Sequence, residues 1–201
     1  MITIIDYGLG NVGSIKNMFK RIGIQSQITS DHEKINQSNK IILPGVGAFD
    51  TAMTELKEKG LITVLNKKVI DNKTPILGIC LGMQLLLENS EEGTLPGLGY
   101  IKGNSRKFHF QDSDMRIPHM GWNQINIKKN HSITQGLEKS KFYFVHSYYV
   151  EVEEEKERLM TTHYGSDFDS AIIKNNIFGV QFHPEKSHKF GMQLFKNFSQ
   201  L

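Results

Sequence analysis

The stretch Thr74-Pro75-Ile76-Leu77-Gly78-Ile79-Cys80-Leu81-Gly82-Met83-Gln84 decides the fold that we expect for this chain. An apolar segment leads into Gly-x-Cys-x-Gly, and a helical pattern follows without a gap. This order is typical of a nucleophile elbow, a sharp strand-to-helix turn, with cysteine in the place of serine. Because the turn strains the backbone of the nucleophile, glycines two residues to either side are needed to avoid clashes. We predict that the Cys80 thiol is exposed at the carboxyl edge of a sheet, where a helix N-terminus favours the thiolate.

Cys80 is the only cysteine in the sequence. A lone cysteine is more often a buried small apolar residue than a reactive group, and the flanking glycines argue against that interpretation here. The backbone N–H of Leu81 would point to where an oxyanion forms during attack on a carbonyl. A single cysteine cannot form an internal disulfide, which fits a reducing compartment.

The sequence on both sides of this stretch predicts an α/β fold. In the first half, short β-branched segments alternate with helix-period segments, as in a parallel sheet with crossover helices. They cover residues 2–6 and 12–22, 40–43 and 48–59, and 75–79 and 82–88. From about Tyr100, strand-like segments predict a mixed or antiparallel extension of the same sheet. They cover residues 115–128, 141–152, 159–164, 170–174 and 177–182, and a helical segment follows at 189–198.

Length and composition predict one compact domain over residues 1–201. Hydrophobic residues make up 38% and charged residues 22% of the chain, as in globular proteins. The formal net charge of +3 is too small and too dispersed to indicate nucleic-acid binding. No basic segment precedes the first apolar segment, and no apolar stretch approaches bilayer length. We therefore expect a cytoplasmic protein that does not bind membranes.

A base for the thiol is predicted in Phe178-Gly179-Val180-Gln181-Phe182-His183-Pro184-Glu185. In an extended chain, residues two apart share a face, so Glu185 can hold the His183 imidazole while the other ring nitrogen addresses Cys80. Pro184 suits the end of a strand rather than its middle. Alone, His-Pro-Glu would equally suit a loop with a surface ion pair. Together with the elbow, it predicts a Cys-His-Glu triad.

Two glycine-rich turns follow other strands. Ile41-Ile42-Leu43-Pro44-Gly45-Val46-Gly47-Ala48-Phe49 can present backbone N–H groups to an oxyanion or a substrate carbonyl, although this pattern alone is weak. Gly8-Leu9-Gly10-Asn11-Val12-Gly13 has the spacing of a dinucleotide fingerprint, with Asp31 at the distance of a ribose-binding acid. Asp31 lies in a polar segment that indicates a loop and a helix N-cap, so we interpret the glycines as a tight turn with close packing.

The eight histidines show no metal-ligand spacing, so we expect no metal site. We expect His146, His163 and His188 to be structural or surface residues.

With these motifs in view, the chain resembles the class I, triad-type glutamine amidotransferases, and within them the glutaminase subunits of imidazole glycerol phosphate synthases. The resemblance covers nearly the full length. It is carried by residues 6–11, 44–49, 78–84, 90–93, 118–123, 143–148 and 179–187. It implies a flavodoxin-like fold with a central, mostly parallel sheet flanked by helices, with an antiparallel extension.

The resemblance also implies roles for individual residues. Cys80 would attack the glutamine amide, His183 would transfer the proton, and Glu185 would orient His183. The oxyanion hole would comprise Val46, Gly47 and Leu81. The remaining glutamine-binding residues would be Gly45, Gln84, Glu92, Ser147 and Tyr148. No cofactor and no metal are implied.

The implied partner is a (β/α)8-barrel cyclase that receives the ammonia through the barrel. The chain would form a heterodimer with it and dock through Pro118, His119, Met120, Trp122, Asn123 and Lys186. The ammonia would be used to form imidazole glycerol phosphate and AICAR in histidine biosynthesis.

Other functions remain open at the level of sequence. Residues 11–18 and 187–195 are also similar to a paralogous branch whose ammonia ends in an amidino sugar of cell-surface glycans. A cysteine peptidase or a chaperone with the same elbow, and a binding module without activity, are further alternatives. Gln84 and Glu92 argue against the peptidase, and the intact triad argues against the binding module.

Overall fold

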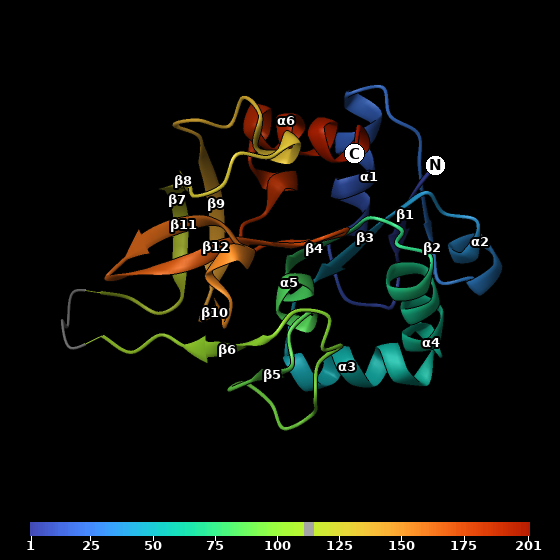
Figure 1. The fold of residues 1–201 in the computed structure, drawn as a ribbon, viewed down its shortest axis with the longest axis horizontal. Helices are drawn as coiled ribbons and strands as arrows, with labels where there is room; N and C mark the ends of the chain where they lie inside the picture. The colour runs from blue at the N-terminus through green and yellow to red at the C-terminus, as the bar shows by residue number, and fades with distance from the viewer. Residues whose placement is uncertain (111–114) are drawn as a thin grey trace.

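The computed structural model describes residues 1–110 and 115–201. Within these residues, eleven strands join in one sheet, with helices on both of its faces (Figure 1). The sheet has a parallel half and an antiparallel half, so the predicted α/β fold with an antiparallel extension is confirmed.

The parallel half holds five strands in the order β2-β1-β3-β4-β13. These are β2 (Ser26–Thr29), β1 (Ile2–Ile5), β3 (Lys40–Gly45), β4 (Ile76–Cys80) and β13 (Ile177–Val180). The register places Gly45 beside Cys80, at the carboxyl ends of β3 and β4. The glycine-rich turn and the elbow therefore leave the sheet side by side.

The antiparallel half continues from β13 through β12, β10 and β6, and β5 adds to β6 in parallel. These strands are β12 (Ser166–Lys174), β10 (Tyr148–Val152), β6 (Gly103–Lys107) and β5 (Asn89–Ser90). β11 (Arg158–Tyr164) pairs with β12 and with β8 (Asn126–Ile127). β7 (His119–Gln124) and β9 (Lys141–His146) form a separate antiparallel ribbon. The strand predicted over 141–152 is thus two strands, with a bend at Ser147 between them.

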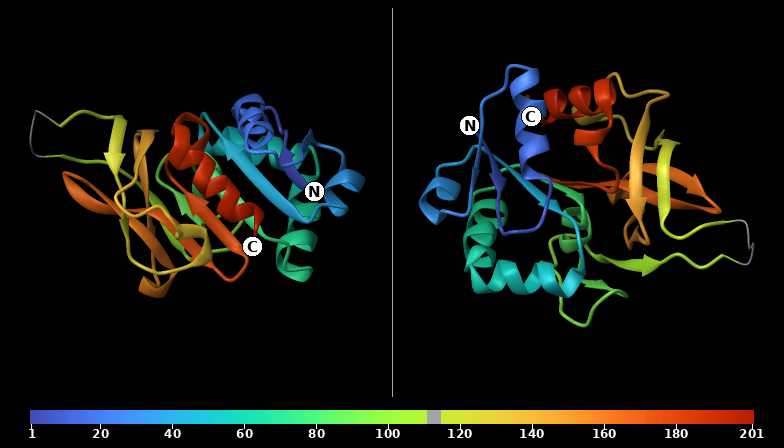
Figure 2. Two further views of the ribbon diagram at one scale, coloured as in Figure 1. Left: turned by 90° about the horizontal axis from the view of Figure 1, so that it is seen from above. Right: turned by 180° about the vertical axis from the view of Figure 1, so that it is seen from behind.

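Helices cover the two faces of the sheet. On one face lie α1 (Val12–Arg21) and α6 (His188–Ser199), and on the other lie α3 (Phe49–Glu58), α4 (Leu61–Asn66) and α5 (Leu81–Leu85) (Figures 1 and 2). A π-helical turn extends α4 over Lys67–Asp71. The predicted helix at 82–88 is shorter than expected, because α5 ends at Leu85.

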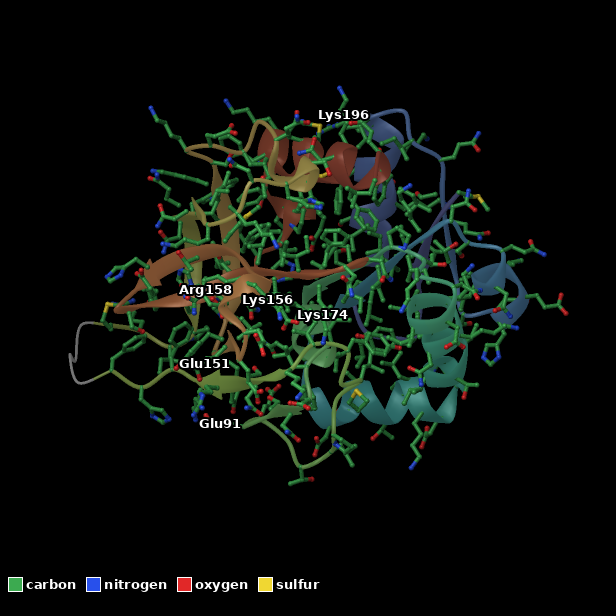
Figure 3. The ribbon with its side chains drawn as sticks, viewed as in Figure 1. Glu91, Glu151, Lys156, Arg158, Lys174 and Lys196 are labelled. Carbon is green, nitrogen blue, oxygen red and sulfur yellow. The ribbon has the colours of Figure 1, made fainter. Side chains whose placement is uncertain are left out.

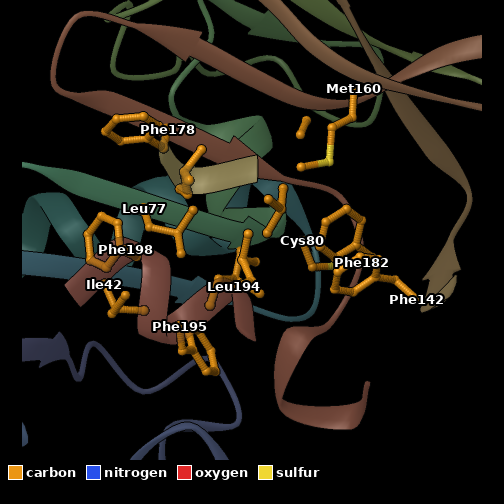
Figure 4. Packing of buried hydrophobic residues seen from close by; sticks show 14 of the residues in the cluster. Ile42, Leu77, Cys80, Phe142, Met160, Phe178, Phe182, Leu194, Phe195 and Phe198 are labelled. Atoms are coloured by element: carbon orange, nitrogen blue, oxygen red, sulfur yellow. The ribbon is translucent and has the colours of Figure 1, made fainter. Parts of the chain in front are cut away.

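Alternate residues of the central strands supply two hydrophobic cores. In β3, Ile42 faces the core that contains Phe195 and Phe198 of α6, whereas Ile41 and Leu43 face the core under α3 and α4 (Figure 4). The ring of Phe19 in α1 lies 4.6 Å from that of Phe195. A parallel strand buried on both faces needs apolar residues, which explains the continuous apolar sequence of β4 and of β3 after Lys40.

Ion pairs link strands of the antiparallel half, where Glu151 and Arg158 lie (Figure 3). Arg158 pairs with the buried Asp169, which also accepts a hydrogen bond of 3.0 Å from the Val152 N–H. Arg106 pairs with Glu151 across β6 and β10. These contacts hold the extension together away from the elbow.

The polar segment at Asp31 is a helix N-cap, as predicted. Its side chain accepts a hydrogen bond of 3.0 Å from the Lys34 N–H at the start of α2 (His32–Asn36). A Cβ on Gly10 would lie 3.0 Å from Pro44 Cβ, so the first glycine-rich turn packs closely against the end of β3.

Candidate active site

The elbow is built on crowded glycines. Cys80 has φ of +55° and ψ of −111°, a strained conformation for a residue with a side chain. A Cβ on Gly78 would come within 2.5 Å of the Gly82 carbonyl oxygen, and a Cβ on Gly82 within 1.9 Å of the Leu43 carbonyl oxygen. Strand β3, strand β4 and helix α5 can therefore approach one another only because both positions lack a side chain.

The Cys80 thiol is less exposed than predicted. Cys80 is 7% exposed and lines the wall of a pocket. Its Sγ lies 4.0 Å from the Val145 carbonyl oxygen and 3.8 Å from Nε2 of Gln181. Val145 of β9 and Gln181, which follows β13, cover the sulfur and shield it from most of the solvent.

His183 and Glu185 are in contact, although not through an extended strand. Strand β13 ends at Val180, and Pro184–Lys186 form a 3-10 turn after His183. His183 Nδ1 lies 2.8 Å from Glu185 Oε1, and both side chains are at most 2% exposed. The His183 N–H donates to the Tyr143 carbonyl oxygen at 2.9 Å, and Ser187 Oγ donates to the His183 carbonyl oxygen at 2.6 Å. The backbone around the imidazole is thus fixed on both sides.

The other ring nitrogen of His183 is available for chemistry. Nε2 is buried and has no hydrogen-bond partner among the described residues, and His183 lines the same pocket as Cys80. Burial favours the neutral ring, but the Cys80 sulfur and the Glu185 carboxylate outweigh burial and raise the pKa of His183 to about 10. The imidazolium is therefore the favoured form beside the sulfur.

A pocket of about 330 Å³ brings most of the predicted residues together. It is lined by Val46, Gly47, Cys80, Leu81, Gln84, Glu92, Pro118, Val145, His146, Ser147, Tyr148, His183 and Lys186. Gly45 and Glu185 lie outside the lining. A Cβ on Gly45 would lie 2.8 Å from the Gly82 N and 2.9 Å from Leu81 Cβ, so Gly45 permits close packing below the pocket.

Gln84 joins two walls of this pocket. Its Nε2 donates to the Tyr148 carbonyl oxygen and to Gln181 Oε1, each at 3.1 Å. Gln181 is fully buried and its own Nε2 faces the Cys80 sulfur. Sequence reasoning did not single out Gln181. The available signal was a polar residue within the apolar segment 177–182, two positions before His183.

Glu92 is held at the mouth of the pocket by the start of α3. Its Oε2 accepts a hydrogen bond of 3.0 Å from the Phe49 N–H. Burial raises the pKa of the Glu92 carboxyl, and the Phe49 N–H partly offsets this. Asp50 fixes the loop that follows, because it accepts from the N–H groups of Thr94 and Leu95 at 2.9 to 3.0 Å.

The turn after β3 is more exposed and less tightly packed than the elbow. Val46 is 42% exposed, and Gly47 is exposed with φ of +110°. A Cβ on Gly47 would meet only Leu9 Cδ2, at 4.0 Å. Beneath the turn, the buried Tyr7 hydroxyl donates to the Pro44 carbonyl oxygen at 2.7 Å. The base of the turn is therefore held, while its tip borders the pocket with few contacts.

The predicted docking residues fall into two groups. Met120 and Trp122 of β7 are 61% and 47% exposed, and Pro118 and Lys186 are exposed at the edge of the pocket. His119 was wrongly expected at this surface. Alternation along the strand turns it inward, and it is 3% exposed.

The remaining docking residue, Asn123, also turns inward, and it is half-buried. Its Nδ2 donates to the His163 carbonyl oxygen at 2.9 Å.

Three histidines expected to be structural or surface residues have distinct positions. His163 is exposed and pairs with Asp167 at 2.7 Å, and His188 is exposed and stacks on Trp122 at 5.5 Å. His146 is structural and also lines the pocket.

Among residues 1–110 and 115–201, no three His, Cys, Asp or Glu side chains are grouped as they would be around a metal ion. No helix in the described part of the chain combines the length and apolar character needed to cross a membrane.

Comparison with known proteins gives a consistent result. The family described as glutamine amidotransferase class-I matches residues 3–200. The imidazole glycerol phosphate synthase subunit HisH 2 of Methanococcus maripaludis is 59% identical, over 98% of this chain and 98% of the relative. The subunit of the same name from Pseudomonas aeruginosa is 50% identical over all of both chains. A crystal structure of a glutamine amidotransferase shares the fold, with a TM-score of 0.77 at 18% identity over 100% of this chain and 98% of that one. The chain is therefore an enzyme of the class I glutamine amidotransferase family.

Proposed function

We propose that the chain hydrolyses L-glutamine to glutamate and ammonia and passes the ammonia to a partner subunit. The observation that carries this proposal is a single pocket that holds the Cys80 sulfur, the free Nε2 of the buried His183–Glu185 pair and the side chains of Gln84 and Glu92. The names of its relatives, as subunits of imidazole glycerol phosphate synthase, support a partner subunit. We further propose a single domain over residues 1–201, acting in the cytoplasm.

The chemistry follows from the two nitrogens of His183. The Cys80 sulfur attacks the amide carbon, the C=O electrons move to the oxygen, and His183 Nε2 holds the thiol proton. When the tetrahedral intermediate collapses, the C–N bond breaks and the Nε2 proton goes to the leaving nitrogen, which departs as ammonia. A water, deprotonated by the same nitrogen, then cleaves the glutamyl thioester to glutamate and free thiol. Glu185 on Nδ1 keeps the ring in place throughout.

The charge that develops on oxygen needs donors near the sulfur. The Leu81 N–H follows the nucleophile directly, and the tip of the turn at Val46 and Gly47 borders the same pocket. We propose that these backbone groups form the oxyanion hole. Gln84, Glu92 and the backbone of Ser147 and Tyr148 would hold the rest of the glutamine, with Gly45 supporting the turn.

The proposed partner is a (β/α)8-barrel cyclase that uses the ammonia to form imidazole glycerol phosphate and AICAR in histidine biosynthesis. Exposed Met120 and Trp122, with Pro118 and Lys186 beside the pocket, would form the docking surface. The names of the relatives give no support to the alternative, an amidino-sugar pathway. A strain that lacks the gene separates the two, because the proposal predicts growth only with added histidine. Normal growth without histidine together with loss of a surface glycan would favour the alternative.

Glutamate release with the partner present tests the activity itself. Wild-type chain should release glutamate and ammonia in equal amounts, and Cys80→Ser should release neither within the assay's detection. Release of ammonia by Cys80→Ser at the wild-type rate would exclude the proposed nucleophile.

A further inference from the structure

Two buried histidines beside the pocket have no part in the proposed chemistry. His119 is 3% and His146 is 6% exposed. His119 Nδ1 and His146 Nε2 are joined by a hydrogen bond of 2.9 Å. The His119 ring also stacks with Phe144 and Tyr164, with ring centroids 4.8 Å and 4.0 Å away. Buried polar rings in an aromatic core cost stability unless all their nitrogens are paired.

The partners of these rings fix the position of every proton. The Tyr148 carbonyl oxygen can only accept, so His146 Nδ1, at 2.8 Å from it, carries hydrogen. In a neutral ring His146 Nε2 then accepts, and His119 Nδ1 must donate to it. His119 Nε2 in turn accepts from Asn123 Nδ2, 3.2 Å away. Asn123 Oδ1 accepts from the Gln124 N–H at 2.8 Å, which agrees with this orientation of the amide.

The result is one directed chain of hydrogen bonds from Asn123 through both histidines to the Tyr148 carbonyl, with all four ring nitrogens satisfied. The chain requires both rings to be neutral. Burial lowers the pKa of His119 to about 4 and that of His146 to about 3, in agreement with the geometry.

This chain of hydrogen bonds ends at one wall of the proposed glutamine pocket. Ser147 is the bend between β9 and β10, and both Ser147 and Tyr148 line the pocket. The Tyr148 carbonyl accepts from His146 and from Gln84, so both of its lone pairs are used. The Ser147 carbonyl accepts from the Phe108 N–H at 3.1 Å. Rotation of either peptide would break at least one of these partly buried bonds.

We infer that His119 and His146 are positioning residues for glutamine, which set the Ser147–Tyr148 wall and tie it to strand β7. The inference rests on the proposed function, since it names how that same pocket is shaped. The other end of this series of hydrogen bonds lies on strand β7. The opposite face of β7 exposes Met120 and Trp122. The two imidazole rings therefore connect strand β7 to the pocket wall at Ser147 and Tyr148.

Two substitutions at His146 separate positioning from packing. In His146→Asn the amide nitrogen occupies roughly the place of Nδ1, so the bond to Tyr148 is kept and that to His119 is lost. In His146→Gln the amide reaches roughly the place of Nε2, so the bond to His119 is kept and that to Tyr148 is lost. Each variant loses one buried hydrogen bond, and thermal unfolding should show matched stability.

The readout is covalent labelling of Cys80 in the full chain by the glutamine-like diazo-ketone 6-diazo-5-oxo-L-norleucine. Labelling by iodoacetamide reports the reactivity of the thiol without the glutamine pocket. We expect His146→Gln to be labelled by the diazo-ketone about tenfold more slowly than wild type, and His146→Asn at a rate within about threefold of it. Iodoacetamide should label all three proteins at similar rates. Asn123→Asp, which removes the first donor of the chain, should slow the diazo-ketone by about threefold.

Equal diazo-ketone rates for His146→Gln and His146→Asn, whether both are slow or both match wild type, would overturn the inference. A parallel loss of iodoacetamide labelling would also overturn it, because the substitution would then act on the thiol. If wild type is not labelled by the diazo-ketone, or if added glutamine does not slow this labelling of Cys80, the proposed function itself fails. That outcome is distinct from the failure of the positioning role.

Discussion

The elbow and the turn after β3 are both rich in glycine, but the glycines have different structural roles in the two places. At Gly82 a Cβ would lie 1.9 Å from the Leu43 carbonyl oxygen, whereas at Gly47 it would meet only one side-chain atom, at 4.0 Å. The first glycine permits contact and leaves no room for movement. The second has a positive φ and few neighbours, so its peptide can turn at little cost. The backbone at the proposed nucleophile is thus fixed, whereas the turn that we propose for the oxyanion hole is adjustable.

Removing the proposed base, His183, should have the largest effect on activity. His183→Ala should lower glutamine-dependent synthesis by the complex by roughly 10³-fold, because Cys80 loses its proton acceptor. Synthesis from added ammonium salt should persist. Glu185→Gln should be milder, since the base remains and only its orientation weakens. If both glutamine-dependent and ammonium-dependent activities fell together, His183 would support the partner interface instead.

Filling the crowded glycine should unfold the elbow. Gly82→Ala is expected to lower the free energy of unfolding by about 3 kcal/mol, because its Cβ would overlap the backbone of β3. The matched control is Gly13→Ala in α1, where a Cβ meets nothing within 4 Å. That change should raise stability by about 0.5 kcal/mol through lower entropy of the unfolded chain. Urea denaturation measures both, and equal stabilities would refute the crowding argument.

Filling the open glycine should act on turnover alone. Gly47→Ala disfavours the positive φ that the turn requires, so the oxyanion donor is misplaced, and kcat for glutamine should fall about a hundredfold. Iodoacetamide should still label Cys80 at the wild-type rate. A loss of thiol labelling would show that the two regions are not independent.

His183 should also give stability a pH dependence. Its pKa is raised to about 10 in the folded state, above the usual 6.5, so the protonated ring favours folding. This stabilisation is complete below about pH 6.5 and is lost as pH rises towards about 10. The difference in unfolding free energy between wild type and His183→Gln should therefore shrink from pH 6 to pH 9. A constant or growing difference would contradict the assigned protonation.

The fold was predictable where local pattern and packing agree. Residues 41–43 and 76–79 are apolar throughout because both faces of a central parallel strand are buried. The helix at 61–66 was not predicted, since Leu61-Ile62-Thr63-Val64-Leu65 is rich in β-branched residues and adopts a helix through its contact with the core under the sheet. The short strands β5 and β6 depend on partners elsewhere in the sequence, since β5 pairs with β6 and β6 pairs with β10.

The proximity of Cys80, His183 and Glu185 was predictable from residue type and spacing. The contact of His183 with Glu185 arises from a 3-10 turn, which spacing alone does not distinguish from a strand. Gln181 was not singled out, and His146 was expected only as a structural or surface residue, because the contacts of both side chains depend on segments distant in sequence. His119 was placed on the wrong side of β7 because the resemblance fixes a segment and not the direction of each side chain.

The most direct test of a preset nucleophile beside an adjustable turn compares two rates in the same samples. Glutamate release and iodoacetamide labelling of Cys80 would be measured for the chain alone, with the partner, and with partner and acceptor substrate. The account predicts that glutamate release rises about a hundredfold or more across the three conditions, as expected when one oxyanion donor becomes available, while the labelling rate of the Cys80 thiol changes little. Equal glutamate release in all three conditions would show that the turn is already set and would contradict the account.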